Sequence, residues 1–245
     1  MTANHVILHV PHSSRAIPSG CQFLLTAIEL EAELDKLTDH DTHSLFNYAG
    51  AAKIVFPVSR VVVDPERFLE DPMESVGMGV VYTRTADGKA LRAISNTERL
   101  VLIDTYYHPH HASLTSLVDD SLKQHGRCLI IDCHSFPAQP LPYETDSNRP
   151  DICIGTDTFH TSTELVDGLS EAFKALGYVV AIDSPFRGTI VPLNHYHTDR
   201  RVSSIMIEVN RSLFDDPSGF ARIQSDLSDL IEQAAAINLS DNTGE

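Results

Sequence analysis

The stretch CLIIDCHSF, residues 128–136, decides the fold that the sequence predicts. It begins with an apolar run and then contains a carboxylate, a thiol, an imidazole and a hydroxyl, from Asp132 to Ser135. A short apolar run of this kind is typical of a strand buried on both faces of a central sheet. In open α/β sheets, ligands bind beyond the carboxyl ends of the strands. We therefore expect the polar end of this stretch to lie at a functional site.

Similar apolar runs alternate along the chain with segments of helical spacing. The predicted strands are 5–10, 53–64, 127–134, 151–155, 178–183 and 204–210. The predicted helices cover roughly 24–37, 40–50, 96–124, 160–176 and 218–237. A capping box starts the third helix at Ser95, and Pro109 should kink it or end its first part. This alternation predicts the α/β class: one domain over residues 1–245, a sandwich with a largely parallel or mixed central sheet flanked by helices, and a frayed tail at about 239–245.

Composition and charge exclude several classes of function. A formal charge of −16 over 245 residues argues against nucleic acid as a partner. Lys53 or turn residues interrupt the longest apolar stretches before they reach membrane-spanning length, so no membrane association is expected. The four cysteines have no C-x-x-C spacing and no signal peptide opens the chain, which predicts a cytoplasmic protein.

Polar residues follow the apolar runs at several places. Asp39 precedes a predicted helix, and His12 and His134 lie just after or at the end of two predicted strands. Two imidazoles and one carboxylate are the ligand set of many catalytic zinc sites, although a lone histidine at a strand end is more often structural. Glu208 lies within an apolar run, where an ionised glutamate needs a partner, so we predict that it is a general base.

Other residues have supporting roles in this hypothesis. Asp132 shares a strand face with His134 and could orient it, whereas Cys133 should pack on the opposite face. Arg67 and Arg84 could each hold a substrate carboxylate with a guanidinium fork. The alternative for both is a surface ion pair with a nearby acid, which contributes little. Serine hydrolase, zincin, P-loop and dinucleotide-binding motifs are all lacking in the sequence.

The chain resembles the N-formylglutamate amidohydrolases, a branch of the zinc carboxypeptidase and aspartoacylase-like hydrolases. The resemblance covers about residues 5–215 and rests on motifs in the family's order: VPHSSRAIP, LTDHDTHSLF, SRVVVDPERF, YYHPHHASL, LIIDCHSF, DICIGT, PFRGTIV and IMIEVNRSL. It implies a phosphorylase/hydrolase-like α/β fold and a zinc cofactor. It also implies a role in histidine catabolism.

The resemblance also implies roles for individual residues. Zinc would be held by His12, Asp39 and His134, and Glu208 would be the catalytic glutamate. Arg67, His111 and Gly188 would bind the substrate. Two positions depart from the family pattern: Arg15 stands where the carboxypeptidases have a ligating glutamate, with His9 the next candidate should Asp39 not be a ligand, and Glu66 replaces the usual asparagine before Arg67.

These observations predict a zinc-dependent amidohydrolase. Its substrate would be a small molecule, an N-formyl or short N-acyl acidic amino acid such as N-formylglutamate. Metal-activated water would attack the amide with Glu208 as the base. The alternatives are a carboxypeptidase-like zinc peptidase and a non-catalytic metal- or ligand-binding relative. The sequence leaves the oligomeric state open.

Overall fold

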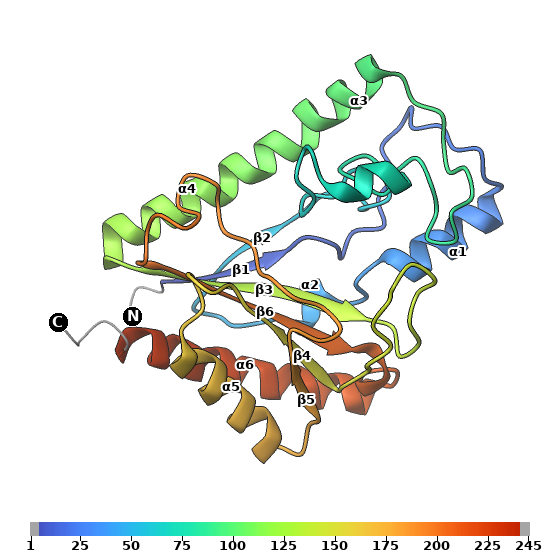
Figure 1. Ribbon diagram of the computed structural model, residues 1–245. Coiled ribbons are helices and arrows are strands. Elements are labelled where there is room, and N and C mark those ends of the chain that lie inside the picture. Colours follow the sequence, from blue (N-terminus) through green and yellow to red (C-terminus); the bar gives the residue numbers. More distant parts are fainter. Residues whose placement is uncertain (1–4, 241–245) are drawn as a thin grey trace.

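A six-stranded mixed sheet lies at the centre of the computed structural model (Figure 1), which describes residues 5–240. The strands are β1 (Val6–Val10), β2 (Ala52–Val55), β3 (Cys128–Phe136), β4 (Ile152–Gly155), β5 (Val180–Ile182) and β6 (Val202–Asn210). Their order is β2-β1-β3-β6-β4-β5, and every neighbouring pair is parallel except β6 and β4. The predicted fold class, an α/β sandwich with a largely parallel or mixed sheet, is confirmed.

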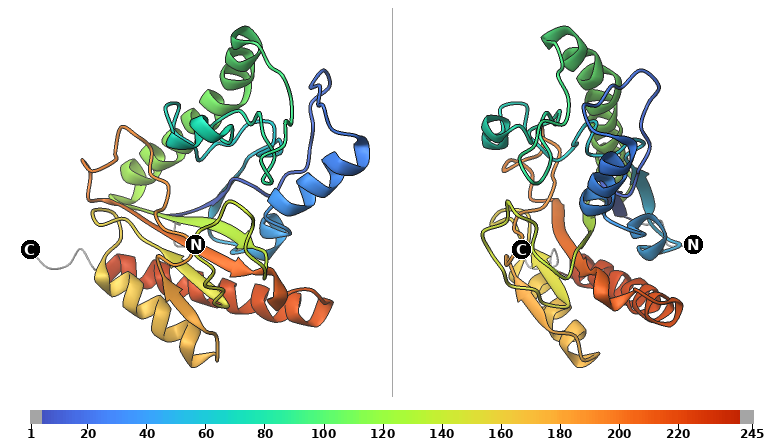
Figure 2. Two further views of the ribbon diagram at one scale, coloured as in Figure 1. Left: turned by 45° about the vertical axis from the view of Figure 1, so that its right-hand side comes forward. Right: turned by 90° about the vertical axis from the view of Figure 1, so that its right-hand side faces the viewer.

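Helices cover both faces of the sheet (Figures 1 and 2). They are α1 (Ala27–Leu37), α2 (Thr42–Leu45), α3 (Asn96–Leu102), α4 (His108–His125), α5 (Thr163–Ala175) and α6 (Pro217–Ser240), with short helical turns η1 (Pro72–Val76), η2 (Ile103–Tyr107) and η3 (Arg211–Leu213). Helices α5 and α6 lie side by side on one face, and α4 crosses the other. The capping box predicted at Ser95 is present, with Glu98 as its acidic partner.

The two-residue period of the strands divides the core between these faces. In β1, Val6 and Leu8 pack in the cluster that includes the α5 and α6 side chains, whereas Ile7 packs with Leu114 and Val118 of α4. Cys133 is fully buried on the α5–α6 face, as predicted. Residues of the opposite parity in β3, Asp132 and His134, therefore lie on the α4 face.

Several predicted boundaries were wrong. The strand predicted at 53–64 ends at Val55, because Pro57 cannot donate to a ladder and residues 60–62 form turns. The helix predicted at 40–50 is only α2. Helix α6 continues to Ser240, so residues 239–240 are helical and the rest of the predicted tail lies outside the described residues.

The long predicted helix at 96–124 is divided but not broken. Its two parts, α3 and α4, are joined by the π-helical turn η2, directly before Pro109. A widened turn accommodates a residue that lacks an N–H and crowds the preceding turn. In Figure 1 the two helices form one continuous rod.

All four cysteines are free thiols. Among residues 5–240, none of the helices has the length and apolar character required to span a membrane.

Candidate active site

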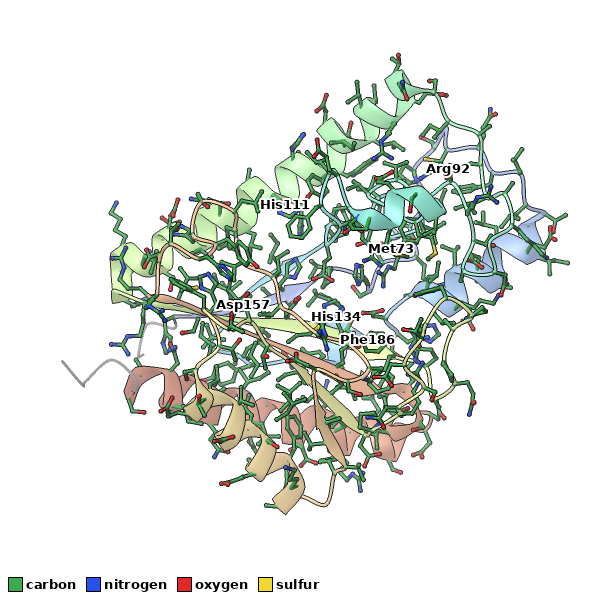
Figure 3. The ribbon with its side chains drawn as sticks, viewed as in Figure 1. Met73, Arg92, His111, His134, Asp157 and Phe186 are labelled. Atoms are coloured by element: carbon green, nitrogen blue, oxygen red, sulfur yellow. The ribbon has the colours of Figure 1, made fainter. Side chains whose placement is uncertain are left out.

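A cavity of about 440 Å³ opens on the α4 face of the sheet, at the carboxyl ends of β3 and β6. Its walls come largely from three long connections, residues 65–95, 136–150 and 184–202. Figure 3 shows His134 in the middle of this region and His111 above it on α4. The cavity therefore lies where ligands bind in this class of fold.

Strand register places the central residues of the cavity. His134 of β3 pairs with Glu208 of β6, and His9 of β1 pairs with Asp132 of β3. Directly paired residues present their side chains on the same face. One imidazole and one carboxylate therefore lie next to each other in each pair.

The structure brings His12, Asp39 and His134 together. One potential ligand atom of each lies within 4.8 Å of the others. Asp39 Oδ2 is 2.9 Å from His134 Nδ1 and 3.6 Å from His12 Nδ1. The backbone N–H of Asp39 donates to the carbonyl of His12, which holds the two residues side by side. The buried Nδ1 of His12 has no hydrogen-bond partner among the described residues. A buried nitrogen without a protein partner is what a metal-binding imidazole would show.

A buried carboxylate lies beside Nε2 of each imidazole, and that of His12 is hydrogen-bonded. His12 Nε2 lies 2.9 Å from Asp64 Oδ1, and because a carboxylate only accepts, this nitrogen carries the proton and the neutral ring has its lone pair on Nδ1. Arg60 and the hydroxyl of Tyr82 donate to the other oxygen of Asp64. His134 Nε2 lies 3.1 Å from Asp132 Oδ1.

A second group, His9, Glu66 and Asp132, also has ligand atoms within 4.8 Å of one another. In this group, however, both ring nitrogens of His9 already have partners: Nδ1 donates to Asp132 at 2.8 Å, and Nε2 lies 2.9 Å from His110 Nε2. Burial lowers the pKa of His110 to about 2, so this ring is neutral. His9 thus supports Asp132, and it lies outside the first group.

The electrostatics of the cavity favour a bound cation. Burial alone would lower the pKa values of His12 and His134, yet the surrounding carboxylates raise both. Burial alone would raise the pKa of Asp39, but the two neighbouring imidazoles, of which His134 is hydrogen-bonded to it, lower it. Glu66 adds a further carboxylate, 3.3 Å from His134 Nε2. Two imidazoles surrounded by several carboxylates form a donor set that can hold a divalent metal ion.

Glu208 lies at the edge of the first group. Its Oε1 is 4.0 Å from His134 Nδ1, and its buried Oε2 has no hydrogen-bond partner among residues 5–240. Burial raises the pKa of Glu208 to about 8, assisted by the charges of Asp39 and Glu66 and opposed by His134. A buried, unpaired carboxylate in a cavity is a candidate general base.

The residues predicted to bind substrate are divided by the structure. Arg67, His111 and Gly188 line the cavity, whereas Arg84 does not and donates to the carbonyl of Gly88 on an exposed turn. Arg67 lies 3.7 Å from Asp64 Oδ2, and its buried Nε has no hydrogen-bond partner in the described part of the chain. His111 Nε2 is 2.8 Å from the carbonyl of Pro65.

Sequence reasoning missed two residues: Asp64, which is fully buried beside His12, and Arg187, which lines the cavity. Asp64 was assigned only as the end of a strand, although a carboxylate directly after three valines was a usable signal. Arg187 is in the motif PFRGTIV, but only Gly188 of that motif was selected. Arg187 lines the cavity as well.

Gly155 allows the loop that carries Gly188 to approach the sheet. A Cβ atom at Gly155 would lie 2.4 Å from the carbonyl oxygen of Gly188 and 2.3 Å from Cε of Met206. The Met206 side chain can move, but the backbone at Gly188 must shift. We expect Gly155→Ala to lower the free energy of unfolding by about 1–3 kcal/mol, the usual cost of overpacking, and to reduce the activity of the site. Urea unfolding and a kinetic assay measure both.

Gly168→Ala is the matched control for this variant. A Cβ there meets only the tip of the Ile237 side chain, which can rotate away. The control should keep stability and activity. Wild-type values for both in Gly155→Ala would show that the loop does not need this close approach.

The fold and the site define the class of the protein: an α/β sandwich domain with a cavity of histidines and carboxylates at the strand ends. The chain belongs to the N-formylglutamate amidohydrolase family, whose model matches residues 4–214. Membership of this family indicates amidohydrolase activity.

Two solved structures have the same fold. N-formylglutamate amidohydrolase from Ralstonia eutropha is 22% identical, with a TM-score of 0.83 over 98% of this chain and 95% of that one. A gene product of Agrobacterium tumefaciens is 20% identical, with a TM-score of 0.71 over 95% of this chain and 91% of that one. None of the curated proteins compared with the chain matches it significantly.

Proposed function

We propose that this protein is a zinc-dependent amidohydrolase that removes the formyl or a short acyl group from an N-acylated acidic amino acid. The observation that carries the proposal is the group of His12, Asp39 and His134, with the unpaired carboxylate of Glu208 next to it. Membership of the family supports the reaction class.

His12, Asp39 and His134 would hold the zinc ion. A zinc ion bound by three protein ligands lowers the pKa of water to about 7 and polarises a carbonyl. Asp64 would keep the imidazole of His12 oriented by accepting from its Nε2, and Asp132 lies 3.1 Å from Nε2 of His134.

Glu208 would move the proton in the reaction. Its carboxylate accepts a proton as water attacks the acyl carbon, and it returns a proton to the amide nitrogen as the C–N bond breaks. The products are the free amino acid and formate, or the corresponding short carboxylate. Burial keeps this carboxylate from the water that would otherwise solvate it.

The proposal is tested by one pair of measurements on the purified protein. Metal analysis should find zinc in about a one-to-one ratio to the chain, the stoichiometry of a single three-ligand site. An assay with N-formyl and N-acetyl amino acids should release formate or acetate from acidic substrates. Turnover of peptides with no turnover of N-acyl amino acids would favour the peptidase alternative, and no turnover of any amide would contradict the proposal.

Arg67→Ala should mainly raise KM. Arg67 lines the cavity with an unsatisfied Nε, so we propose that it holds the α-carboxylate of the substrate. A charge-assisted hydrogen bond contributes about 1.5–3 kcal/mol, which corresponds to a rise of about 10–100-fold in KM if ground and transition states are held equally. Steady-state kinetics with N-formylglutamate measure the change.

Two further variants define the role of Arg67. Arg67→Lys should restore only part of the affinity, because an ammonium group is a point charge without a fork. Arg84→Ala, which changes an arginine outside the cavity, should behave as wild type. Unchanged kinetics in Arg67→Ala would leave Arg67 as an ion-pair partner of Asp64 only.

A further inference from the structure

We propose that Arg187 binds the side-chain carboxylate of the substrate and so selects N-acylated dicarboxylic amino acids over their neutral counterparts. This inference rests on the proposed function, because it concerns the substrate of the same cavity. It adds to Arg67 a second cationic group with a different target.

Most lysine and arginine side chains of the cavity already form ion pairs or hydrogen bonds within the protein. The lysine and arginine residues that line the cavity are Lys36, Arg60, Arg67, Arg187 and Arg211. Lys36 pairs with Asp87, Arg60 binds Asp64 through two nitrogens, and Arg211 donates to backbone carbonyls. These three side chains are held by residues of the walls, although the buried Nε of Arg211 has no hydrogen-bond partner among residues 5–240.

Arg187 differs from the others in having no internal partner. It is exposed, and it makes no hydrogen bond or ion pair with any residue in the described range 5–240. The acids of the outer wall have partners of their own: Glu144 pairs with Arg149, and Asp157 lies 3.0 Å from His197 Nε2. Arg187 is therefore the cavity arginine whose whole guanidinium fork is available to a carboxylate, and Arg67 retains a free Nε.

The backbone on both sides of Arg187 is fixed. Before it, the carbonyl of Phe186 accepts from the Cys153 thiol of β4. After it, Thr189 Oγ1 lies 2.7 Å from Ser204 Oγ of β6, and the N–H of Ile190 donates to Asp132 at 3.1 Å. An arginine on such a segment can present its fork from a defined point while its side chain stays available, which is the arrangement that a binding group requires.

The charges of the cavity explain why a second arginine is needed. Asp39, Glu66, Asp132 and Glu208 make its inner part acidic. A dicarboxylate entering it has to be compensated at both ends, or it is repelled. Arg67 can meet one carboxylate, and Arg187 supplies the second fork.

The inference is tested by pairing substrate changes with the arginine change. N-formyl-L-glutamate, N-formyl-L-glutamine and N-formyl-L-alanine differ only in the side chain. Arg187→Ala should lower kcat/KM for N-formyl-L-glutamate by about 10–100-fold, the loss expected for a charge-assisted pair, and should change the other two less than about threefold. Arg187→Lys should recover part of the loss, and Arg84→Ala should show none.

Binding of the amino-acid product provides a readout that does not depend on turnover. In calorimetric titrations, L-glutamate should bind Arg187→Ala more weakly than wild type by the same factor, whereas L-glutamine should bind both equally. An equal loss for all three substrates, or equal L-glutamate affinity in the two proteins, would overturn the inference. If the wild type hydrolyses none of the three, the proposed function fails, and the titration alone decides whether Arg187 recognises a dicarboxylate.

Discussion

Glu208→Gln should lower turnover by about 10²–10⁴-fold, the usual contribution of a general base, while zinc remains bound. The glutamine keeps the shape of the side chain but cannot accept the proton of water. Glu208 Oε2 has no partner in the described part of the chain, so the change breaks no hydrogen bond of that atom. Metal analysis and single-turnover kinetics on one preparation measure both effects.

Glu33→Gln is the matched control for Glu208→Gln. Glu33 is also a buried glutamate, but it lies outside the cavity and accepts from the N–H of Ala86, which the glutamine oxygen can still do. The control should keep full turnover. A Glu208→Gln protein with wild-type turnover would exclude Glu208 as the base, and one that loses several kcal/mol of stability would indicate a buried ion-pair partner instead.

His134→Ala should remove zinc and activity together. The variant keeps only two of the three proposed ligands, too few to hold zinc firmly. His12→Ala should have the same effect. The protein should stay folded, because Arg60 and Tyr82 still donate to the carboxylate of Asp64 when the imidazole is removed. Metal analysis after dialysis, together with the circular dichroism of the folded protein, distinguishes metal loss from unfolding.

His5→Ala is the control for both histidine variants. His5 is buried and lies next to the amino end of β1, away from the cavity. It should keep its zinc. Full zinc occupancy in His134→Ala or His12→Ala would show that the ligand assignment is wrong. Metal retention in Asp39→Ala would remove only Asp39 from the proposed set of ligands.

Local patterns in the sequence were sufficient to predict the face of the sheet that carries the site. The alternation of Ile131, Asp132, Cys133 and His134 assigns two polar side chains to one face and two apolar ones to the other, and the structure has this arrangement. The reason is geometric, since successive side chains of a strand point to opposite faces whatever the neighbours are. The residues at the ends of the apolar runs suggested His12, Asp39 and Glu208, and the resemblance to the family implied the same roles for them.

The boundary errors arose where local pattern and tertiary packing disagree. The sequence Val61–Val63 predicts a strand, yet Val61 and Val62 lie in a turn that Val63 follows, and all three are buried against residues of α1 and η2 and not in the sheet. Burial of apolar side chains does not require a ladder, so β propensity at these positions was overridden. This turn is what brings Asp64 beneath His12.

Only the tertiary structure decided the contacts between residues that lie far apart in the sequence. His134 meets Asp39 across 95 positions of sequence, and His9 meets Asp132 across 123. The free fork of Arg187 likewise depends on which acids the loops bring near it, and Glu144 and Asp157 are paired elsewhere. The sequence by itself determined which strand side chains point to the α4 face, because the alternation of side chains along a strand is local. The tertiary structure decided which of these side chains contact one another. Strand register and loop packing set those contacts, and both depend on segments far apart in the chain.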